Sequence, residues 1–178
     1  MTKKPKDTTV SSAKVRRKKP KLIAMDSCGI SEEGKTMNEF YNEITVDVLA
    51  RTLWGEARGE GADGMKAVAN VILNREKIAR EKGKFWWGND IIQICQKPYQ
   101  FSCWNRSDPN FRKLQEVDKR DLYFATALRI ANRAVAGALE DVTGGATHYH
   151  AASIMPYWAK GKEPITVIGS HKFYNLVG

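Results

Sequence analysis

The sequence predicts an α+β fold that is mainly helical, with a small antiparallel sheet late in the chain. Apolar residues recur at helical spacing in three segments between residues 45 and 144. After Thr147 the pattern changes to alternating β-branched and aromatic residues, which is typical of strands. With 178 residues, 42% of them hydrophobic and 28% charged, the chain is long enough for one well-buried domain.

The first predicted helix begins at Thr45, a suitable N-cap, and ends near Ala57. Its buried stripe follows the i, i+3, i+4 repeat through Val46, Leu49, Ala50, Leu53, Trp54 and Ala57. Asp63 is expected to cap a second helix that runs to about Lys77, with a packing stripe of Met65, Val68, Ala69 and Ile72.

The aromatic run Phe85-Trp86-Trp87-Gly88 breaks the helical pattern, and a short helix is expected at residues 89–95. Residues 96–120 are rich in Pro, Asn, Asp and aromatic side chains, so we expect a loop that forms the wall of a groove. Asp121 can open the longest predicted helix, which Gly144-Gly145 would end.

The late sheet is predicted from residues 147 onward. Candidate strands lie at residues 165–168 and 172–176, on either side of Gly169-Ser170.

The net charge of +9 is concentrated at the start of the chain, because residues 1–25 hold nine Lys or Arg against Asp7. This segment lacks apolar periodicity, so we expect residues 1–40 to form a disordered basic leader and linker, and residues 41–178 the folded domain. The leader is expected to contact anionic lipid, lipopolysaccharide or wall polymer. A solubilising or nucleic-acid-binding leader is the alternative, since any such cationic segment binds polyanions.

The three cysteines form an odd set, which excludes a complete disulfide framework within the chain. Cys28 lies near the leader, whereas Cys95 and Cys103 flank a polar and aromatic block. A bridge between the latter two would staple that block in an oxidising compartment. A buried, reduced pair is the default expectation.

Glu56 is the first candidate for a catalytic residue. Helical spacing places it beside Leu49, at the edge of the buried stripe, where the first helix runs into Gly59 and Gly61. Desolvation disfavours the charged form of a carboxyl, so a half-buried glutamate can hold a proton and donate it to a leaving oxygen. The alternative is an ordinary helix-end carboxylate that pairs with Arg51 or Arg58.

Four ordered blocks carry a resemblance to a known family. The run from Leu49 to Gly61 (LARTLWGEARGEG), followed by GMKAVANVILNR, resembles the opening motif of the SleB/CwlJ family of bacterial cell-wall hydrolases. The further blocks are Gln100-Phe101-Ser102 with Trp104, then ATHYHA from Ala146, and IGSHKFY from Ile168. Together they span roughly residues 45–175.

The resemblance implies a lysozyme-like fold and cleavage of the bond between N-acetylmuramic acid and N-acetylglucosamine in peptidoglycan, with Glu56 as the catalytic acid. It favours a lytic transglycosylase, which releases a 1,6-anhydro product with a single glutamate as acid and then base. The alternative is a hydrolytic muramidase or glucosaminidase, which needs a second carboxylate. Glu60 is the candidate, although pairing with Arg58 or capping the next helix is its simpler role.

The remaining residues of these blocks are expected to bind sugar. Aromatic faces stack on pyranose rings, which suggests Trp104, Tyr149, Trp158 and Tyr174 as platforms, with Phe101 beside them. Gln100 and Ser102 can hydrogen-bond the glycan, and Tyr149 or His150 can stabilise the transition state or orient the attacking hydroxyl. Each of these aromatic residues is also a candidate for the core.

Other classes of function stay open at this stage. One alternative is a zinc amidase, suggested by three histidines, His148, His150 and His171. Their spacing matches no zinc motif, so we expect no metal and no cofactor. A wall-binding module without turnover and a polyanion-binding protein are further alternatives. The expected partner is peptidoglycan and the expected state a monomer.

The expected location is the cell wall or periplasm. Leu22-Ile23-Ala24-Met25 is too short for the apolar region of a signal peptide. We therefore expect synthesis in the cytoplasm and later release to the wall, as for a phage endolysin.

Overall fold

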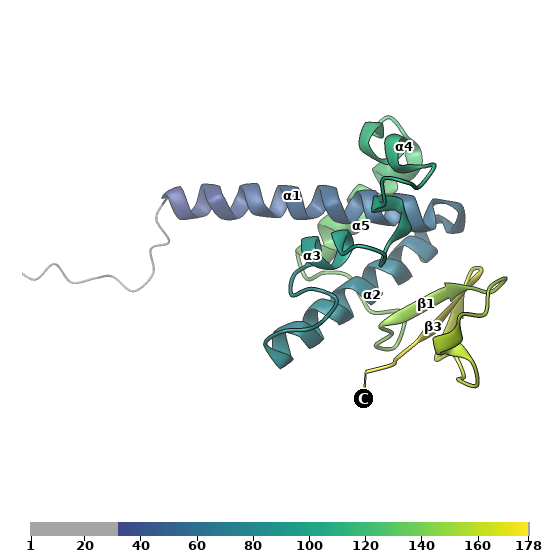
Figure 1. The fold of residues 1–178 in the computed structure, drawn as a ribbon. Helices are drawn as coiled ribbons and strands as arrows, with labels where there is room; N and C mark the ends of the chain where they lie inside the picture. The colour runs from purple at the N-terminus through teal and green to yellow at the C-terminus, as the bar shows by residue number, and fades with distance from the viewer. Residues whose placement is uncertain (1–31, 178) are drawn as a thin grey trace, which may run out of the picture.

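The computed structural model describes residues 32–177, with side chains from Thr36 onward, and confirms the α+β class. Its helices are α1 (Glu32–Ala57), α2 (Gly61–Lys82), α3 (Ile91–Gln96), α4 (Phe111–Glu116) and α5 (Leu122–Val135). Its strands are β1 (His148–Ala151), β2 (Thr166–Ile168) and β3 (His171–Tyr174), and short 3₁₀ helices lie at η1 (Arg58–Glu60), η2 (Ser102–Trp104) and η3 (Tyr157–Ala159). Figure 1 shows a helical body with the sheet on one side. None of the helices within residues 32–177 is long and apolar enough to cross a membrane.

The helical body is held together by α1, α2 and α5, which pack against one another. The predicted stripes of the first two helices point into this core, where the fully buried side chains include Leu49, Leu53, Met65, Val68 and Ile72. Alanines at positions 127 and 131 of α5 are also fully buried, so the helix backbones can approach closely.

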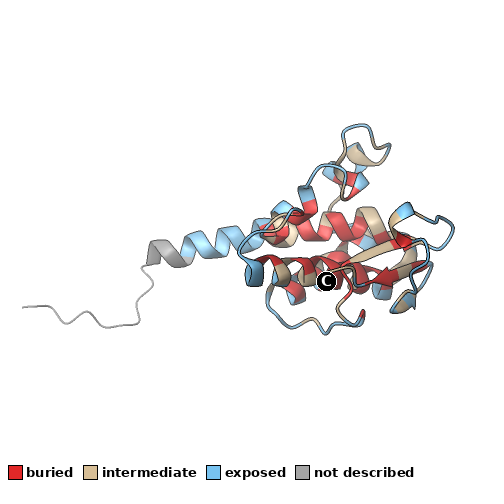
Figure 2. Ribbon diagram, turned by 60° about the horizontal axis from the view of Figure 1, so that its bottom comes forward, coloured by how far each residue is buried: buried red, intermediate tan, exposed pale blue. Residues whose placement is uncertain are grey.

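Helix α1 begins thirteen residues earlier than predicted. The N-cap assigned to Thr45 is wrong, because its hydroxyl donates to the Tyr41 carbonyl one turn back within the helix (2.8 Å). The first part of α1 projects from the body in Figure 1, and its exposed surface is pale blue in Figure 2. This arm exposes the large apolar side chains of Met37, Phe40, Tyr41 and Ile44.

The expected basic leader and Cys28 lie outside the described residues. The division into a leader and linker (1–40) and a catalytic domain (41–178) stays a prediction, and α1 crosses that boundary without a break.

Two further helix boundaries differ from prediction. Asp63 lies in the first turn of α2 and does not cap it, and Gly83 ends the helix in the left-handed conformation (φ 78°). The Asp121 cap is confirmed, because its carboxylate accepts from the Phe124 amide (2.9 Å). However, α5 ends at Val135, and Gly137 (φ 68°) turns the chain well before Gly144. The longest described helix is therefore α1.

The predicted loop at residues 96–120 contains two short helical elements, η2 and α4. Arg51 of α1 holds α4 in place, because its guanidinium donates to the Leu114 and Gln115 carbonyls (2.5 and 3.2 Å). The loop is thereby fixed beside the end of α1.

The sheet has the order β1-β3-β2 with antiparallel pairing throughout, close to the predicted strands. Tyr149 pairs with Phe173, and Ala151 with His171, so these four side chains share one face. That face packs on α2, where Phe173 is buried with Ala67 and Val71. The sheet thus brings Tyr149 against the helical body.

Candidate active site

Glu56 lies in the last turn of α1 and is half-buried, as its position in the stripe predicted. Its carboxylate accepts a hydrogen bond from the Tyr149 hydroxyl of β1 (2.9 Å) and a longer one from the Cys103 amide of η2 (3.5 Å). Three segments that are far apart in the sequence therefore converge on one carboxyl group.

The ion-pair alternative for Glu56 is wrong. Arg51 pairs with Asp47 and with α4, while Arg58 donates to the Trp54 carbonyl (3.2 Å) and to Asn110 (3.1 Å). None of the salt bridges found among residues 36–177 includes Glu56. The Glu56 carboxylate accepts hydrogen bonds only from uncharged donors, the Tyr149 hydroxyl and the Cys103 amide, among residues 36–177.

Gly55 allows η2 to reach Glu56. A Cβ atom at this position would lie 2.6 Å from Cys103 Cβ and 2.8 Å from Cys103 Sγ, closer than non-bonded atoms can pack. The glycine before Glu56 in the opening motif therefore has a packing role, because it lets the Cys103 amide approach the carboxylate. Both Cys95 and Cys103 are buried, free thiols, as the default expectation held.

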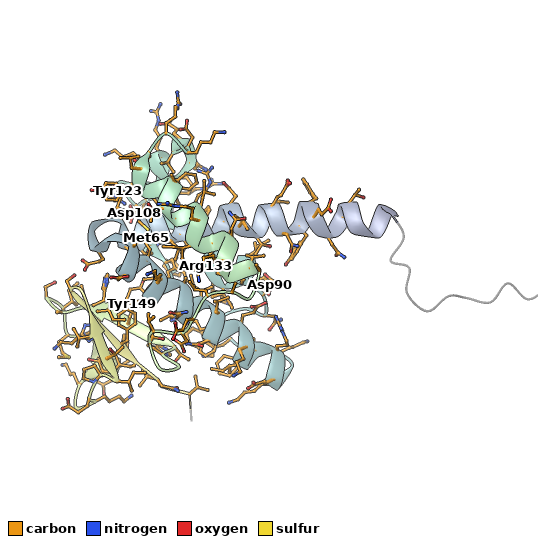
Figure 3. All side chains as sticks on the ribbon, turned by 180° about the vertical axis from the view of Figure 1, so that it is seen from behind. Met65, Asp90, Asp108, Tyr123, Arg133 and Tyr149 are labelled. Atoms are coloured by element: carbon orange, nitrogen blue, oxygen red, sulfur yellow. The ribbon has the colours of Figure 1, made fainter. Side chains whose placement is uncertain are left out.

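Tyr149 is fixed where the sheet meets the helices, as its label in Figure 3 shows. Its ring stacks on Phe173 (centroids 5.7 Å apart) and meets the edge of His171 (5.2 Å). Burial, followed by the negative charge of Glu56 and the hydrogen bond to it, raises the pKa of Tyr149 well above its usual value. The hydroxyl thus keeps its proton and remains a donor to Glu56.

Two open grooves lie near the partners of Glu56, although Glu56 itself lines neither of them. The first, here the Tyr149 groove, has a volume of about 510 Å³ and is lined by Arg75, Trp86, Lys97, Pro98, Tyr99, Gln100, His148, Tyr149 and Trp158. The second, the Trp104 groove, has a volume of about 380 Å³ and is lined by Gln96, Pro98, Tyr99, Trp104, Asn105, Arg106 and Ser107. Their walls combine aromatic rings with amide and cationic groups, which suits a polar ligand with apolar faces.

Gln100 lines the Tyr149 groove as predicted, but both ends of its side-chain amide are already bound. Its oxygen accepts from Arg75 (2.6 Å) and its nitrogen donates to the Trp87 carbonyl (3.2 Å). Arg75 also donates to the Thr147 carbonyl (2.7 Å), and burial lowers its pKa to about 10, which leaves it charged at neutral pH. Gln100 therefore anchors the loop on α2.

Three of the predicted sugar-binding residues lie in the interior. Phe101 is 1% exposed and Tyr174 2%, so neither offers a ring face to a ligand. His150 is also buried, with one ring nitrogen at 3.0 Å from the Tyr174 hydroxyl and the other at 2.9 Å from the Ala151 carbonyl. These three side chains therefore pack in the interior of the fold.

Three other predicted residues remain accessible. Trp104 and Trp158 are partly exposed and line the Trp104 and Tyr149 grooves, respectively. Trp104 is oriented by a hydrogen bond from its indole nitrogen to the Thr52 hydroxyl (2.9 Å). Ser102 is exposed at the start of η2. They stay candidates for contact with a ligand.

Glu60 does not join Glu56 but holds the turn between β2 and β3. Its two oxygens accept from the Ser170 amide (2.8 Å) and the Ser170 hydroxyl (2.6 Å). Side chains at Gly64 or Gly169 would collide with it, so both glycines leave room for this contact. Neither the expected pairing with Arg58 nor a side-chain cap on α2 is observed.

We expect Glu60→Ala to lower the free energy of unfolding by about 1 kcal/mol, because two hydrogen bonds to an exposed carboxylate are lost. The hydroxyl and amide of Ser170 lower the pKa of Glu60, so its contribution is present above the carboxyl's unfolded pKa and disappears as the pH falls through the folded one. Urea unfolding of the variant and the parent, at neutral pH and in acid, measures this difference in the free energy of unfolding. An equal difference between variant and parent at both pH values would contradict the assignment.

The three histidines do not converge on one point. His148 and His150 share one face of β1, while His171 lies on the opposite face of the sheet beside Tyr149. Within residues 36–177, no cluster of three His, Cys, Asp or Glu side chains has the arrangement of a metal site. The zinc amidase hypothesis therefore has no ligand set in this part of the chain.

His148 makes stability sensitive to acid. Burial, with the positive charges of Arg75 and Lys162, lowers its pKa from 6.5 to about 4. The unfolded chain binds a proton at higher pH than the folded one, so stability is full above 6.5 and falls between about pH 6.5 and 4. We expect a shallower decline of Tm over this range in His148→Gln; an unchanged slope would exclude His148 as its source.

Several residues of the site were missed in the sequence. Arg75 carries a usable signal, since a cation three positions after Ile72 on an apolar stripe must find buried partners. Cys103 and Tyr99 carry no such signal, because their roles depend on the path of the loop. The loop's path is set by contacts with α1 and α2 that lie far away in sequence.

An open groove with polar and aromatic walls, near one half-buried carboxyl, can bind a polar ligand and place a proton donor close to it. The chain belongs to the Cell Wall Hydrolase family, whose model matches residues 59–174. The matched region includes Glu60, both grooves and the sheet, and it begins three residues after Glu56.

A spore cortex-lytic enzyme from Halalkalibacterium halodurans is 28% identical over 155 residues, or 85% of this chain. The chain spans about two fifths (41%) of the length of that relative. No solved structure matches the chain significantly. The lysozyme-like character of the fold therefore stays a prediction.

Proposed function

We propose that this protein degrades peptidoglycan by cleaving the glycan bond between N-acetylmuramic acid and N-acetylglucosamine as a lytic transglycosylase. The observation that carries the proposal is the position of Glu56, a half-buried carboxyl held by Tyr149 and Cys103 beside the Tyr149 groove. Family membership and the cortex-lytic relative support a substrate in the cell wall.

In this mechanism, protonated Glu56 donates its proton to the glycosidic oxygen as the bond to the muramic acid C1 breaks. The resulting carboxylate takes the proton of the 6-hydroxyl of the same sugar while that oxygen bonds to C1. Glu56 thus returns to its starting state, and no water is consumed. Tyr149 keeps the carboxyl oriented throughout, since its own proton is firmly held.

A single-carboxylate mechanism is favoured over a two-carboxylate hydrolysis by the position of Glu60. Both oxygens of Glu60 are used by Ser170, at the turn between two strands. A base or nucleophile for an incoming water must instead face the substrate's anomeric carbon. The muramic acid hydroxyl removes the need for this second group.

The test is mass spectrometry of the muropeptides that the wild-type protein and Glu56→Gln release from purified peptidoglycan. We expect 1,6-anhydro-muramyl products from the wild type and none from the variant. Products with reducing-end sugars would show that the enzyme is a hydrolase and not a transglycosylase. Free stem peptides, or equal cleavage by Glu56→Gln, would refute glycan cleavage by this glutamate.

We further propose that the enzyme acts at the wall after release from the cytoplasm, as an endolysin does, and that the basic leader increases its affinity for anionic wall or lipid surfaces. The charge of residues 1–25 supports this.

A further inference from the structure

Tyr99 has an unusual backbone conformation. It is the one non-glycine residue with positive φ (65°) within residues 32–177, and a bulky side chain there is strained. The residue nevertheless has 91% of its surface exposed. Packing of the ring therefore does not offset the strain.

The surrounding turn shows what holds Tyr99 in place. The Gln100 amide donates to the Lys97 carbonyl (3.1 Å), and Pro98 occupies the second position of the turn. With proline second and positive φ third, this is the pattern of a type II turn, in which glycine is the usual third residue. The doubly bound side chain of Gln100 fixes the end of the turn on Arg75 and Trp87.

The location of Tyr99 suggests a reason for this strain. Tyr99 and Pro98 line both the Tyr149 groove and the Trp104 groove. The Glu56 carboxylate, in turn, accepts hydrogen bonds from Tyr149 on the first side and from Cys103, the neighbour of Trp104, on the second. The exposed side chain of Tyr99 thus lies between two grooves. Tyr149, which holds Glu56, is in the wall of one, and Trp104, the neighbour of Cys103, is in the wall of the other.

We propose that Tyr99 is a sugar-stacking residue that joins the two grooves into one track for a glycan strand. This inference rests on the proposed function and adds a binding residue outside the predicted set. A rigid aromatic ring offers an apolar face to a pyranose at little entropic cost, because the turn already fixes its backbone. Lys97 on one side and Arg106 on the other place a cation in each groove for the carboxylates of the wall polymer.

The test measures binding in the inactive Glu56→Gln background, by co-sedimentation with purified peptidoglycan sacculi. Adding Tyr99→Ala or Tyr99→Gly is expected to weaken binding about tenfold, whereas Tyr99→Phe retains it. Tyr123→Ala on α5 is the matched control, because this tyrosine is also exposed and Figure 3 places it far from Tyr149.

The thermal readout separates binding from stability. Glycine relieves the positive-φ strain, so Tyr99→Gly should melt at the same temperature as its parent or higher while it binds more weakly. A lower Tm together with weaker binding would assign Tyr99 a purely structural role and overturn the proposal.

Two outcomes distinguish this inference from the proposed function. If the wild type releases anhydro-sugars but Tyr99→Gly binds sacculi as tightly as its parent, the stacking role alone is refuted. If the wild type cleaves no glycan and Glu56→Gln does not sediment with sacculi, both proposals fail.

Discussion

Glu56→Gln is expected to lower the rate of glycan cleavage about 10³-fold, within the range ascribed to general acid–base catalysis. The amide cannot supply a proton to the glycosidic oxygen or remove one from the muramic acid hydroxyl. The amide is nearly isosteric with the carboxylate, and its one oxygen can still accept from Tyr149. Only the longer bond from the Cys103 amide (3.5 Å) loses its acceptor, so the fold should be retained. Release of soluble muropeptides measures the rate, and thermal melting checks the fold.

Glu60→Gln is the matched control for this substitution, since it neutralises the other carboxyl of the same motif. Because Glu60 contacts Ser170 rather than Glu56, this variant should retain most of the cleavage activity. Comparable losses in both variants would favour a two-carboxylate mechanism.

Gly55→Ala is expected to disturb both stability and activity. The new Cβ would collide with the Cys103 side chain close to the η2 backbone, which cannot rotate away. Overpacking of this kind costs up to about 3 kcal/mol, and the better helix propensity of alanine returns only about 1 kcal/mol. A net loss of about 2 kcal/mol should lower Tm by roughly 4–8 °C.

The same displacement moves the Cys103 amide away from Glu56, so cleavage should fall more than the loss of folded protein explains. Gly59→Ala tests this in the same motif, because nothing lies within 4 Å of a Cβ at that position. It should melt and cleave like the wild type. A Gly55→Ala protein that does the same would show that η2 can shift freely.

The buried stripes of α1 and α2 and the late strands could be predicted because each element has its own periodicity. Helix ends were harder. Thr45 has the chemistry of a cap, but nothing local reveals that the thirteen residues before it continue the helix. Conversely, Gly137 ends α5 through its backbone conformation, although the apolar pattern extends beyond it.

For the site, periodicity placed Glu56 correctly at a half-buried edge, and the family resemblance indicated the blocks that surround it. Sequence could not distinguish Tyr149 from Tyr174, since each is an aromatic residue of a family block. Their difference arises from the sheet, in which Tyr149 faces Glu56 and Tyr174 lies on the other face beside His150. That alternation depends on the register between β1 and β3, which no local pattern specifies.

The two buried thiols make the folded domain indifferent to the redox state of its surroundings. Burial raises the pKa of Cys95 to about 12, and burial together with the charge of Glu56 raises the pKa of Cys103 still further. Thiolates are the species that oxidants and disulfides attack, and almost none form here at neutral pH. A chain made among cytosolic reductants and moved to an oxidising wall would therefore keep the same covalent structure around Glu56.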